Sequence, residues 1–195
     1  MAETAPRSIL VKPAGPDCGM ACGYCFYSGK AGLYPETATH RMDEAVLDAT
    51  LRQFLDQPAS ELSIGWQGGE PTLMGLPFFE RAVALEERYG DGKTIGNGLQ
   101  TNGLLLDRRW ARFFRQYRFL IGLSIDGPAD VHDRYRVRRG GGGTWARVRD
   151  AARMLLDEGV PVNALTVVND VTVRFPEEIY DHHRALGLDY MQFIP

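Results

Sequence analysis

The segment Cys18-Gly19-Met20-Ala21-Cys22-Gly23-Tyr24-Cys25 holds every cysteine of this 195-residue chain, at the spacing C-x3-C-x2-C. It follows the apolar run at 8–11, which reads as a first strand. Three thiols are an odd number and lie too close in sequence to cross-link a fold, so a disulfide framework is not expected. The segment instead predicts a loop that holds a metal centre through three protein ligands and leaves one position open.

Apolar runs and helical patterns alternate along the rest of the chain. Strands are expected at 8–11, 62–66, 94–100, 119–125, 162–168 and 190–194. Helices are expected at 43–54, 77–89, 107–117 and 176–186, and between Thr144, which can cap its helix, and Gly159. Strands that are nearly continuous in apolar residues predict a parallel sheet, and right-handed crossovers curl such a repeat toward a barrel. The predicted fold is α/β: a partial (βα)6 TIM-like barrel, truncated after the sixth strand, forming one domain over residues 1–195.

Composition limits the classes of function. With 44% hydrophobic and 24% charged residues, the chain is expected to fold as a globular protein. A net charge of −3 argues against a broad nucleic-acid surface. The local basic cluster Arg134, Arg136, Arg138 and Arg139 is either a solvated loop or a site for an anionic group. No apolar stretch approaches the ~20 residues of a membrane helix, and the N-terminus has no signal-peptide core. The sequence therefore predicts a cytoplasmic protein that binds neither membranes nor nucleic acids.

The cysteine spacing allows two kinds of metal centre. Cysteine thiolates hold iron–sulfur clusters, usually one per iron, so three of them would leave one iron of a [4Fe-4S] cluster free for a small ligand. The alternative is a zinc site with a histidine as fourth ligand, for which His40 is the nearest in sequence. Cys18, Cys22 and Cys25 are the metal ligands in either case.

A second motif, Trp66-Gln67-Gly68-Gly69-Glu70-Pro71, directly follows the second expected strand. The two glycines would let a ligand approach the backbone closely, and Glu70 offers a carboxylate to a cationic group such as an amine. A Gly-Gly-Glu turn is a weak signal alone. After a C-x3-C-x2-C loop, in a chain of alternating strands and helices, it is a strong one.

Together the two motifs resemble those of the radical S-adenosylmethionine (SAM) superfamily. The resemblance implies that the three cysteines bind a [4Fe-4S] cluster and that the free iron is chelated by the amino and carboxylate groups of S-adenosylmethionine. It also implies that Glu70 lies near that amine. One electron from the reduced cluster would cleave the cofactor to methionine and a 5′-deoxyadenosyl radical, which abstracts a hydrogen from the substrate. The protein would bind, orient and shield these groups.

Further segments are similar to one branch of that superfamily, the anaerobic sulfatase-maturating enzymes, which oxidise a cysteine or serine of a sulfatase to formylglycine. These segments are CGYCFY at 22–27, WQGGEP at 66–71, LQTNG at 99–103, LSIDGP at 123–128, HDRYR at 132–136 and MQFIP at 191–195. The likeness covers residues 8–195. It implies a protein or peptide substrate of the sulfatase kind and an electron donor such as a flavodoxin or ferredoxin.

The same likeness assigns the binding residues. Tyr27, Gly69, Ser124 and Arg136, with Glu70, would contact S-adenosylmethionine, Arg136 facing its carboxylate and Ser124 its ribose. Gln67 would line the substrate side. Plain turn chemistry could equally explain Ser124 and Asp126 before Gly127-Pro128, and it is the preferred explanation of Asn102-Gly103.

The chain departs from this branch in one respect. Those enzymes continue into a cysteine-rich C-terminal domain with two auxiliary clusters and the proposed general base, whereas no cysteine follows Cys25. No catalytic residue is therefore identified, and the auxiliary-cluster domain is expected to be absent. Two alternatives stay open: a radical SAM maturase of ribosomally made peptides, and a non-catalytic, truncated metal-binding fragment.

Overall fold

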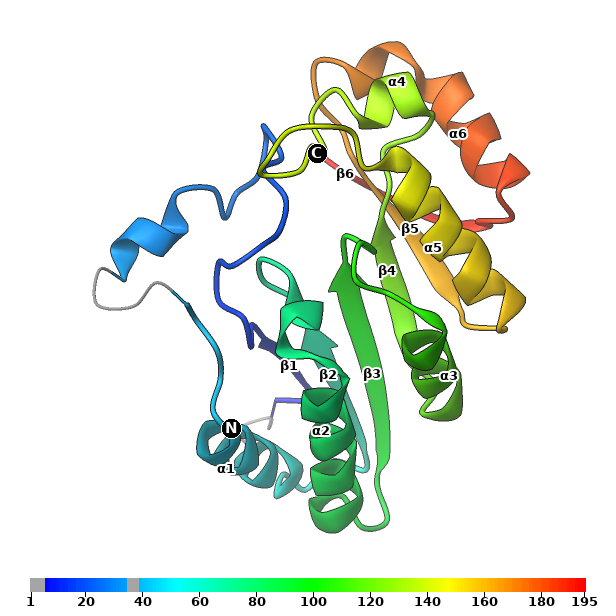
Figure 1. Ribbon diagram of the computed structural model, residues 1–195. Helices are drawn as coiled ribbons and strands as arrows, with labels where there is room; N and C mark the ends of the chain where they lie inside the picture. The colour runs from blue at the N-terminus through cyan, green and yellow to red at the C-terminus, as the bar shows by residue number, and fades with distance from the viewer. Residues whose placement is uncertain (1–5, 35–38) are drawn as a thin grey trace, which may run out of the picture.

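The computed structural model describes residues 6–34 and 39–195; residues 1–5, part of the N-terminal stretch considered above, and 35–38 lie outside it. Six strands alternate with helices along the described chain (Figure 1). The strands are β1 (Ser8–Val11), β2 (Glu61–Trp66), β3 (Thr94–Thr101), β4 (Leu120–Ser124), β5 (Val162–Val167) and β6 (Tyr190–Ile194). The α-helices are α1 (Glu44–Leu55), α2 (Leu76–Tyr89), α3 (Arg108–Gln116), α4 (Ala129–His132), α5 (Trp145–Asp157) and α6 (Pro176–Ala185). Short 3-10 turns are η1 (Lys30–Leu33), η2 (Pro71–Met74) and η3 (Thr172–Arg174).

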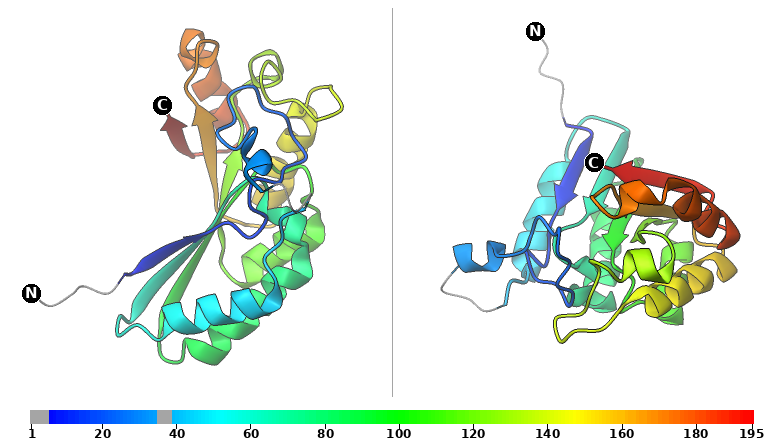
Figure 2. Two further views of the ribbon diagram at one scale, coloured as in Figure 1. Left: turned by 90° about the vertical axis from the view of Figure 1, so that its left-hand side faces the viewer. Right: turned by 90° about the horizontal axis from the view of Figure 1, so that it is seen from above.

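The six strands form one parallel sheet in the order β1-β2-β3-β4-β5-β6. The predicted α/β class and parallel order are therefore confirmed. The sheet is curled but open, because β1 pairs only with β2 and β6 only with β5 among the described strands. Figure 2 shows the helices covering one face of the curl while β1 and β6 form its two free edges.

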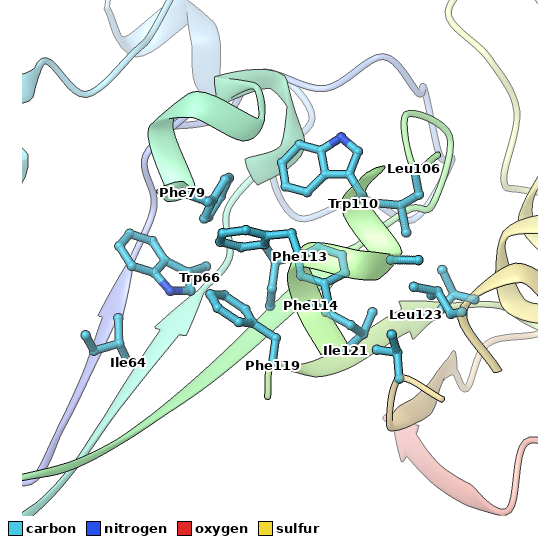
Figure 3. Packing of buried hydrophobic residues seen from close by; sticks show 14 of the residues in the cluster. Ile64, Trp66, Phe79, Leu106, Trp110, Phe113, Phe114, Phe119, Ile121 and Leu123 are labelled. Carbon is cyan, nitrogen blue, oxygen red and sulfur yellow. The ribbon is translucent and has the colours of Figure 1, made fainter. Parts of the chain in front are cut away.

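The core lies between the sheet and the helices on its outer face. A group of aromatic side chains from β2, α2 and α3 fills it (Figure 3), in which Trp66, Phe79 and Trp110 follow one another in edge-on contacts. Trp66 and Phe79 are fully buried. Since burial of each such side chain is worth roughly 1.5–3 kcal/mol, this group fixes α2 and α3 against the strands. The strand ends that carry the polar motifs are thereby held at one rim of the sheet.

Aspartates begin two of the helices as the sequence suggests. The carboxylates of Asp43 and Asp107 accept hydrogen bonds from the first backbone N–H groups of α1 and α3. The start of α5 differs from the prediction, since Thr144 makes no side-chain cap. Its hydroxyl instead donates to the carbonyl of Arg136, and Asp133 caps the helix by accepting from the N–H groups of Thr144 and Trp145. A side chain from outside the helix thus replaced the local cap.

None of the helices within residues 6–34 and 39–195 has the length and apolar character needed to cross a membrane.

Candidate functional site

The cysteine segment lies across the carboxyl-terminal rim of the sheet, between two other segments. On one side the N–H groups of Gly69 and Glu70 donate to the carbonyls of Gly15 and Asp17, at 2.8 and 2.7 Å. On the other side residues 19–23 run beside 135–139, through hydrogen bonds such as that from the N–H of Ala21 to the carbonyl of Val137. Figure 1 shows the cysteine loop (blue) and the loop before α5 (yellow-green) close together above the sheet. Two remote segments therefore hold the loop.

The glycine pair after β2 serves this contact. A Cβ built on Gly69 would lie 2.1 Å from the carbonyl oxygen of Asp17, and one on Gly68, whose φ is +118°, would lie 2.8 Å from that of Gly15. The sequence predicts that these glycines make room for a ligand. In the structure it is the chain's own backbone, just before Cys18, that comes so close. The turn thus sets the height of the cysteine loop above the sheet.

One cavity at this rim brings together nearly all of the predicted site residues. All three cysteines line it, and so do Tyr27, Gln67, Gly69, Ser124 and Arg136. A second cavity of about 330 Å³ adjoins it and shares the three cysteines and Tyr27. Glu70 is the exception, because it is buried beside the cavity rather than on its wall.

The donor set fits an iron–sulfur cluster. The three cysteines are free and half-buried, and the backbone N–H of Met20 donates to the Sγ of Cys18 at 3.4 Å. Burial raises the pKa of Cys22 to about 11 despite the nearby Arg136. The Cys22 thiol is therefore protonated at neutral pH until a metal takes the place of the proton. Each thiolate of a cluster binds a different iron, so the three sulfurs need not converge on one point.

The zinc alternative finds less support. The Nδ1 of His40 lies 2.8 Å from the Oδ1 of Asp17, and its Nε2 is buried without a partner in the described structure, but His40 lines neither of the two cavities that the cysteines line. His132, His182 and His183 also have hydrogen-bond partners elsewhere. Within the described ranges, no group of three or more His, Cys, Asp and Glu side chains is arranged to hold a single metal ion.

Arg136 is the charged centre of the cavity wall. Its side chain is buried, and its Nη1 donates to the hydroxyl of Tyr24 at 2.8 Å. That hydroxyl in turn donates to the Oδ2 of Asp126 at 2.5 Å. The Nε of Arg136 is buried without a hydrogen-bond partner in the described structure. The arginine therefore keeps donor capacity for an anion in the cavity.

Electrostatics keep Arg136 charged. Burial alone would lower its pKa, but Tyr24, Asp126 and Cys22 outweigh that effect and raise the pKa. For Asp126 burial prevails, so its pKa is raised, although Arg136, Tyr24 and the N–H of Val167 all favour the carboxylate. The wall thus carries a fixed positive charge within a largely buried network.

A second layer of hydrogen bonds holds this network from behind. The backbone N–H of Asp126 donates to the Nδ1 of His132, whose Nε2 lies 3.0 Å from the hydroxyl of Thr144. Burial, followed by the charge of Arg136, lowers the pKa of His132 to about 2, so the ring is neutral. Because Thr144 also bonds the carbonyl of Arg136, the backbones of both charged residues are anchored to one neutral histidine.

Glu70 lies on the opposite side of the loop and meets only neutral donors. Its Oε1 accepts from the N–H and hydroxyl of Thr72 and from the hydroxyl of Thr101, and its Oε2 accepts from the N–H of Asn102 at 2.7 Å. Burial raises its pKa, and these four hydrogen bonds partly offset that effect. Oε2, with a single partner, is the oxygen with capacity to spare.

The site contains three residues that sequence reasoning did not place there. The sequence pattern assigns no role to Tyr24, and turns can explain both Asp126 and Asn102. All three make contacts across 84 or more positions: Tyr24 with Asp126 and Arg136, and Asn102 with Cys18. The one available signal was position, since Asp126 and Asn102 both follow the ends of parallel strands, where the rim of such a sheet collects polar side chains.

Comparison with known proteins identifies the class. The sequence matches the Radical SAM superfamily over residues 13–186, so the chain belongs to that superfamily. Membership implies a [4Fe-4S] cluster and S-adenosylmethionine as cofactors, in agreement with the sequence prediction. The superfamily is one of enzymes.

The particular relatives are sulfatase-maturating enzymes. The chain is 37% identical over 191 residues to a serine-type anaerobic sulfatase-maturating enzyme of Bacteroides thetaiotaomicron, covering 97% of this chain and 46% of the relative. It is 36% identical over 190 residues to a cysteine-type enzyme of Clostridium perfringens, covering 97% and 51%. The chain thus spans about half the length of the curated relatives it matches. The predicted resemblance to this branch is confirmed.

Solved structures show the same similarity. Native anSMEcpe with bound AdoMet superposes with a TM-score of 0.90 at 36% identity, over 97% of this chain and 51% of that one. SuiB of Streptococcus suis bound to its precursor peptide SuiA shares the fold, with a TM-score of 0.71 at 18% identity, over 96% and 39%.

Proposed function

We propose that this chain is the radical SAM core domain, over residues 1–195, of an anaerobic sulfatase-maturating enzyme. In this proposal Cys18, Cys22 and Cys25 hold a [4Fe-4S] cluster, and S-adenosylmethionine binds beside it. The observation that carries the proposal is the shared cavity, where the three thiols meet residues from the ends of several strands. Bound there, the two cofactors supply one-electron reductive cleavage and the hydrogen abstraction that starts oxidation of the substrate.

Five residues in or beside the cavity have a role in holding the cofactor. Arg136 faces the cofactor carboxylate, which its unpartnered Nε supports. Ser124 offers its hydroxyl to the ribose, and Tyr27 and the backbone of Gly69 flank the cofactor. Glu70 receives the amino group through the spare capacity of its Oε2, within the same buried turn.

The substrate side belongs to the whole protein. We propose that the full-length enzyme oxidises a cysteine or serine of a sulfatase to formylglycine, with Gln67 lining the substrate side of the cavity, where its Nε2 donates to Gln100 at 2.6 Å. The support is the identity of 36–37% to maturases of both the serine and cysteine types. Maturation of a ribosomally made peptide is the second candidate, since such maturases are expected to share the same core.

We further infer that the electron comes from an acidic carrier such as a flavodoxin or ferredoxin. Exposed arginines of the loop beside the cysteines support this. Arg138 forms a backbone bridge with Met20, and the Nε of Arg139 donates to the carbonyl of Cys18 at 2.8 Å. Positive charge next to the cluster loop would steer a negatively charged donor toward it. Because free thiols persist in a reducing compartment, we place the protein in the cytoplasm.

The role of Arg138 and Arg139 in docking the electron carrier can be tested with two reductants. The double variant Arg138→Glu/Arg139→Glu should be reduced by reduced flavodoxin at least about tenfold more slowly than the parent at low salt. Photoreduced deazaflavin, which needs no docking, should reduce the parent and the double variant at the same rate. The matched control Arg112→Glu/Arg115→Glu adds the same charges on α3, away from the loop, and should leave both rates unchanged. Equal loss with both reductants would contradict a docking role.

The cofactor proposal is tested by anaerobic reconstitution with iron and sulfide, followed by reduction with S-adenosylmethionine present. We expect about four irons per chain and release of 5′-deoxyadenosine. Cys22→Ala should abolish the cluster, whereas Glu70→Ala should retain it and weaken cofactor binding. One zinc per chain and no cleavage would contradict the proposal.

The substrate is tested in the full-length enzyme with peptides. A sulfatase peptide that contains the target cysteine or serine should gain an aldehyde, detected by mass spectrometry, and the same peptide with alanine at that position should not. Cofactor cleavage without oxidation of either peptide type would favour the peptide-maturase candidate. No cleavage at all in the loaded enzyme would favour a non-catalytic metal-binding role.

A further inference from the structure

Asn102, the first residue after β3, makes two different contacts with its side chain. The Oδ1 accepts a hydrogen bond from the N–H of Leu104 at 2.9 Å, which is the turn contact that the sequence suggests. The Nδ2 donates to the Sγ of Cys18 at 3.4 Å. A backbone N–H can only donate, so the contact with Leu104 fixes which end of the amide is the oxygen. The NH₂ group must therefore face the sulfur.

The backbone of this residue is held just as firmly. The N–H of Asn102 donates to the Oε2 of Glu70, and the hydroxyl of Thr101 donates to the Oε1 of the same carboxylate. The N–H of Gly103 then donates to the hydroxyl of Thr101 at 3.1 Å. Asn102 is 6% exposed and Glu70 only 1%. Little freedom remains for the amide to turn away from Cys18.

The thiols of Cys18 and Cys22 have different surroundings. Cys18 receives two N–H donors, from Asn102 and from the backbone of Met20. Cys22 lies near the charge of Arg136 instead. Hydrogen bonds to cluster sulfurs set the reduction potential, because each donor stabilises the more negatively charged, reduced state more than the oxidised one.

We propose that Asn102 is a positioning residue that donates to the Cys18 thiolate and raises the reduction potential of the cluster, and that Glu70 acts through it by holding its backbone. The inference rests on the cluster of the proposed function. It also gives Glu70 a role separate from any contact with the cofactor amine.

The test is a redox titration of the reconstituted chain, followed by electron paramagnetic resonance, without S-adenosylmethionine. Asn102→Asp retains the acceptor for Leu104 but replaces the donor with an acceptor, and Asn102→Ala removes both. Each variant should keep about four irons per chain. At a fixed applied potential the ratio of reduced to oxidised cluster should fall about tenfold, which for a one-electron couple corresponds to about 59 mV.

Asn97→Ala is the matched control. Asn97 is a buried asparagine within β3, five residues before Asn102, but it bonds to Trp66 and Glu86, away from the cysteines. It should leave the potential unchanged. Full iron content with an unshifted potential in both Asn102 variants would overturn the inference, and so would loss of the cluster from both, since Asn102 would then only support folding. Failure of the parent chain to take up four irons would instead overturn the proposed function.

A double-mutant cycle tests whether Glu70 acts on the reduction potential through Asn102. Glu70→Gln removes an acceptor of the Asn102 N–H, which lowers the potential, and a negative charge near Cys18, which raises it. In the Asn102→Ala background only the charge effect remains, so the shift caused by Glu70→Gln should be more positive there than in the parent. Equal shifts in the two backgrounds would show that Glu70 does not act through Asn102.

Discussion

Glu70 and Asp126 are both buried carboxylates that follow parallel strands, β2 and β4, on the same rim of the sheet, yet different chemistry holds them. Glu70 accepts four hydrogen bonds, all from neutral donors. Asp126 accepts from the hydroxyl of Tyr24 and the N–H of Val167, and it faces the charge of Arg136. Around Glu70, hydrogen bonds between uncharged donors and the carboxylate hold Asn102 next to Cys18. Around Asp126, the cation Arg136 lies near Cys22. The cysteine loop is therefore held by uncharged hydrogen bonds on one side and faces a positive charge on the other.

Removing the cation should have the largest effect. Arg136→Met would leave Asp126 buried without its positive neighbour, and breaking a buried pair in this way typically costs about 3–5 kcal/mol. We expect the free energy of unfolding in urea to fall by that order. The double variant Arg136→Met/Asp126→Asn should recover much of the loss. If the single variant were as stable as the parent, Asp126 would be held as Glu70 is, by neutral donors alone.

A third buried carboxylate, Glu86 of α2, has fewer hydrogen-bond partners than either Glu70 or Asp126. Its Oε2 accepts from Asn97 at 2.8 Å, and its Oε1 is buried without a partner among the described residues. Burial raises its pKa from 4.5 to about 7. The folded state therefore binds this proton more tightly than the unfolded state. Stability should be full below about pH 4.5 and fall as the pH rises to about 7.

The corresponding variant is Glu86→Gln. At pH 8 it should be more stable than the parent by about 2–3 kcal/mol, and at pH 4.5 the advantage should vanish. Urea unfolding at the two pH values measures this. An advantage that is the same at both values would mean that Glu86 does not ionise within this window.

Glu70→Gln should cost less than the loss of Arg136, about 2 kcal/mol, because the site loses part of its acceptor set but leaves no unpaired ion. Thermal or urea unfolding at pH 7 gives the value. A loss of unfolding free energy as large as that of Arg136→Met would indicate that a cation lies close to the Glu70 carboxylate.

Tyr24→Phe should have the smallest effect, about 1 kcal/mol, since it removes one hydroxyl that both donates to Asp126 and accepts from Arg136. The guanidinium and carboxylate remain to attract each other. S-adenosylmethionine should bind more weakly to this variant, as measured by calorimetry, if the hydroxyl positions Arg136. Unchanged affinity would restrict Tyr24 to packing.

The local features of the fold could be predicted from the sequence. Each strand and main helix is encoded by neighbouring residues, such as the aspartates that begin α1 and α3. The short helix α4 was missed, because its four residues follow Pro128 without a recognisable apolar period. The cap of α5 was assigned to Thr144, the nearest suitable residue, although Asp133 makes it from 11 positions away.

The cysteine triad, the alternation of strands and helices and the family can all be predicted from the sequence, because they depend on residue type and short spacing. How the triad is held was set instead by the tertiary structure. It turned Glu70 toward Asn102, joined Tyr24 to residues more than 100 positions away, and laid the backbone of Asp17 against Gly69. The physical reason is that parallel strands gather their ends at one rim, so residues far apart in the chain meet there through contacts that no local pattern records.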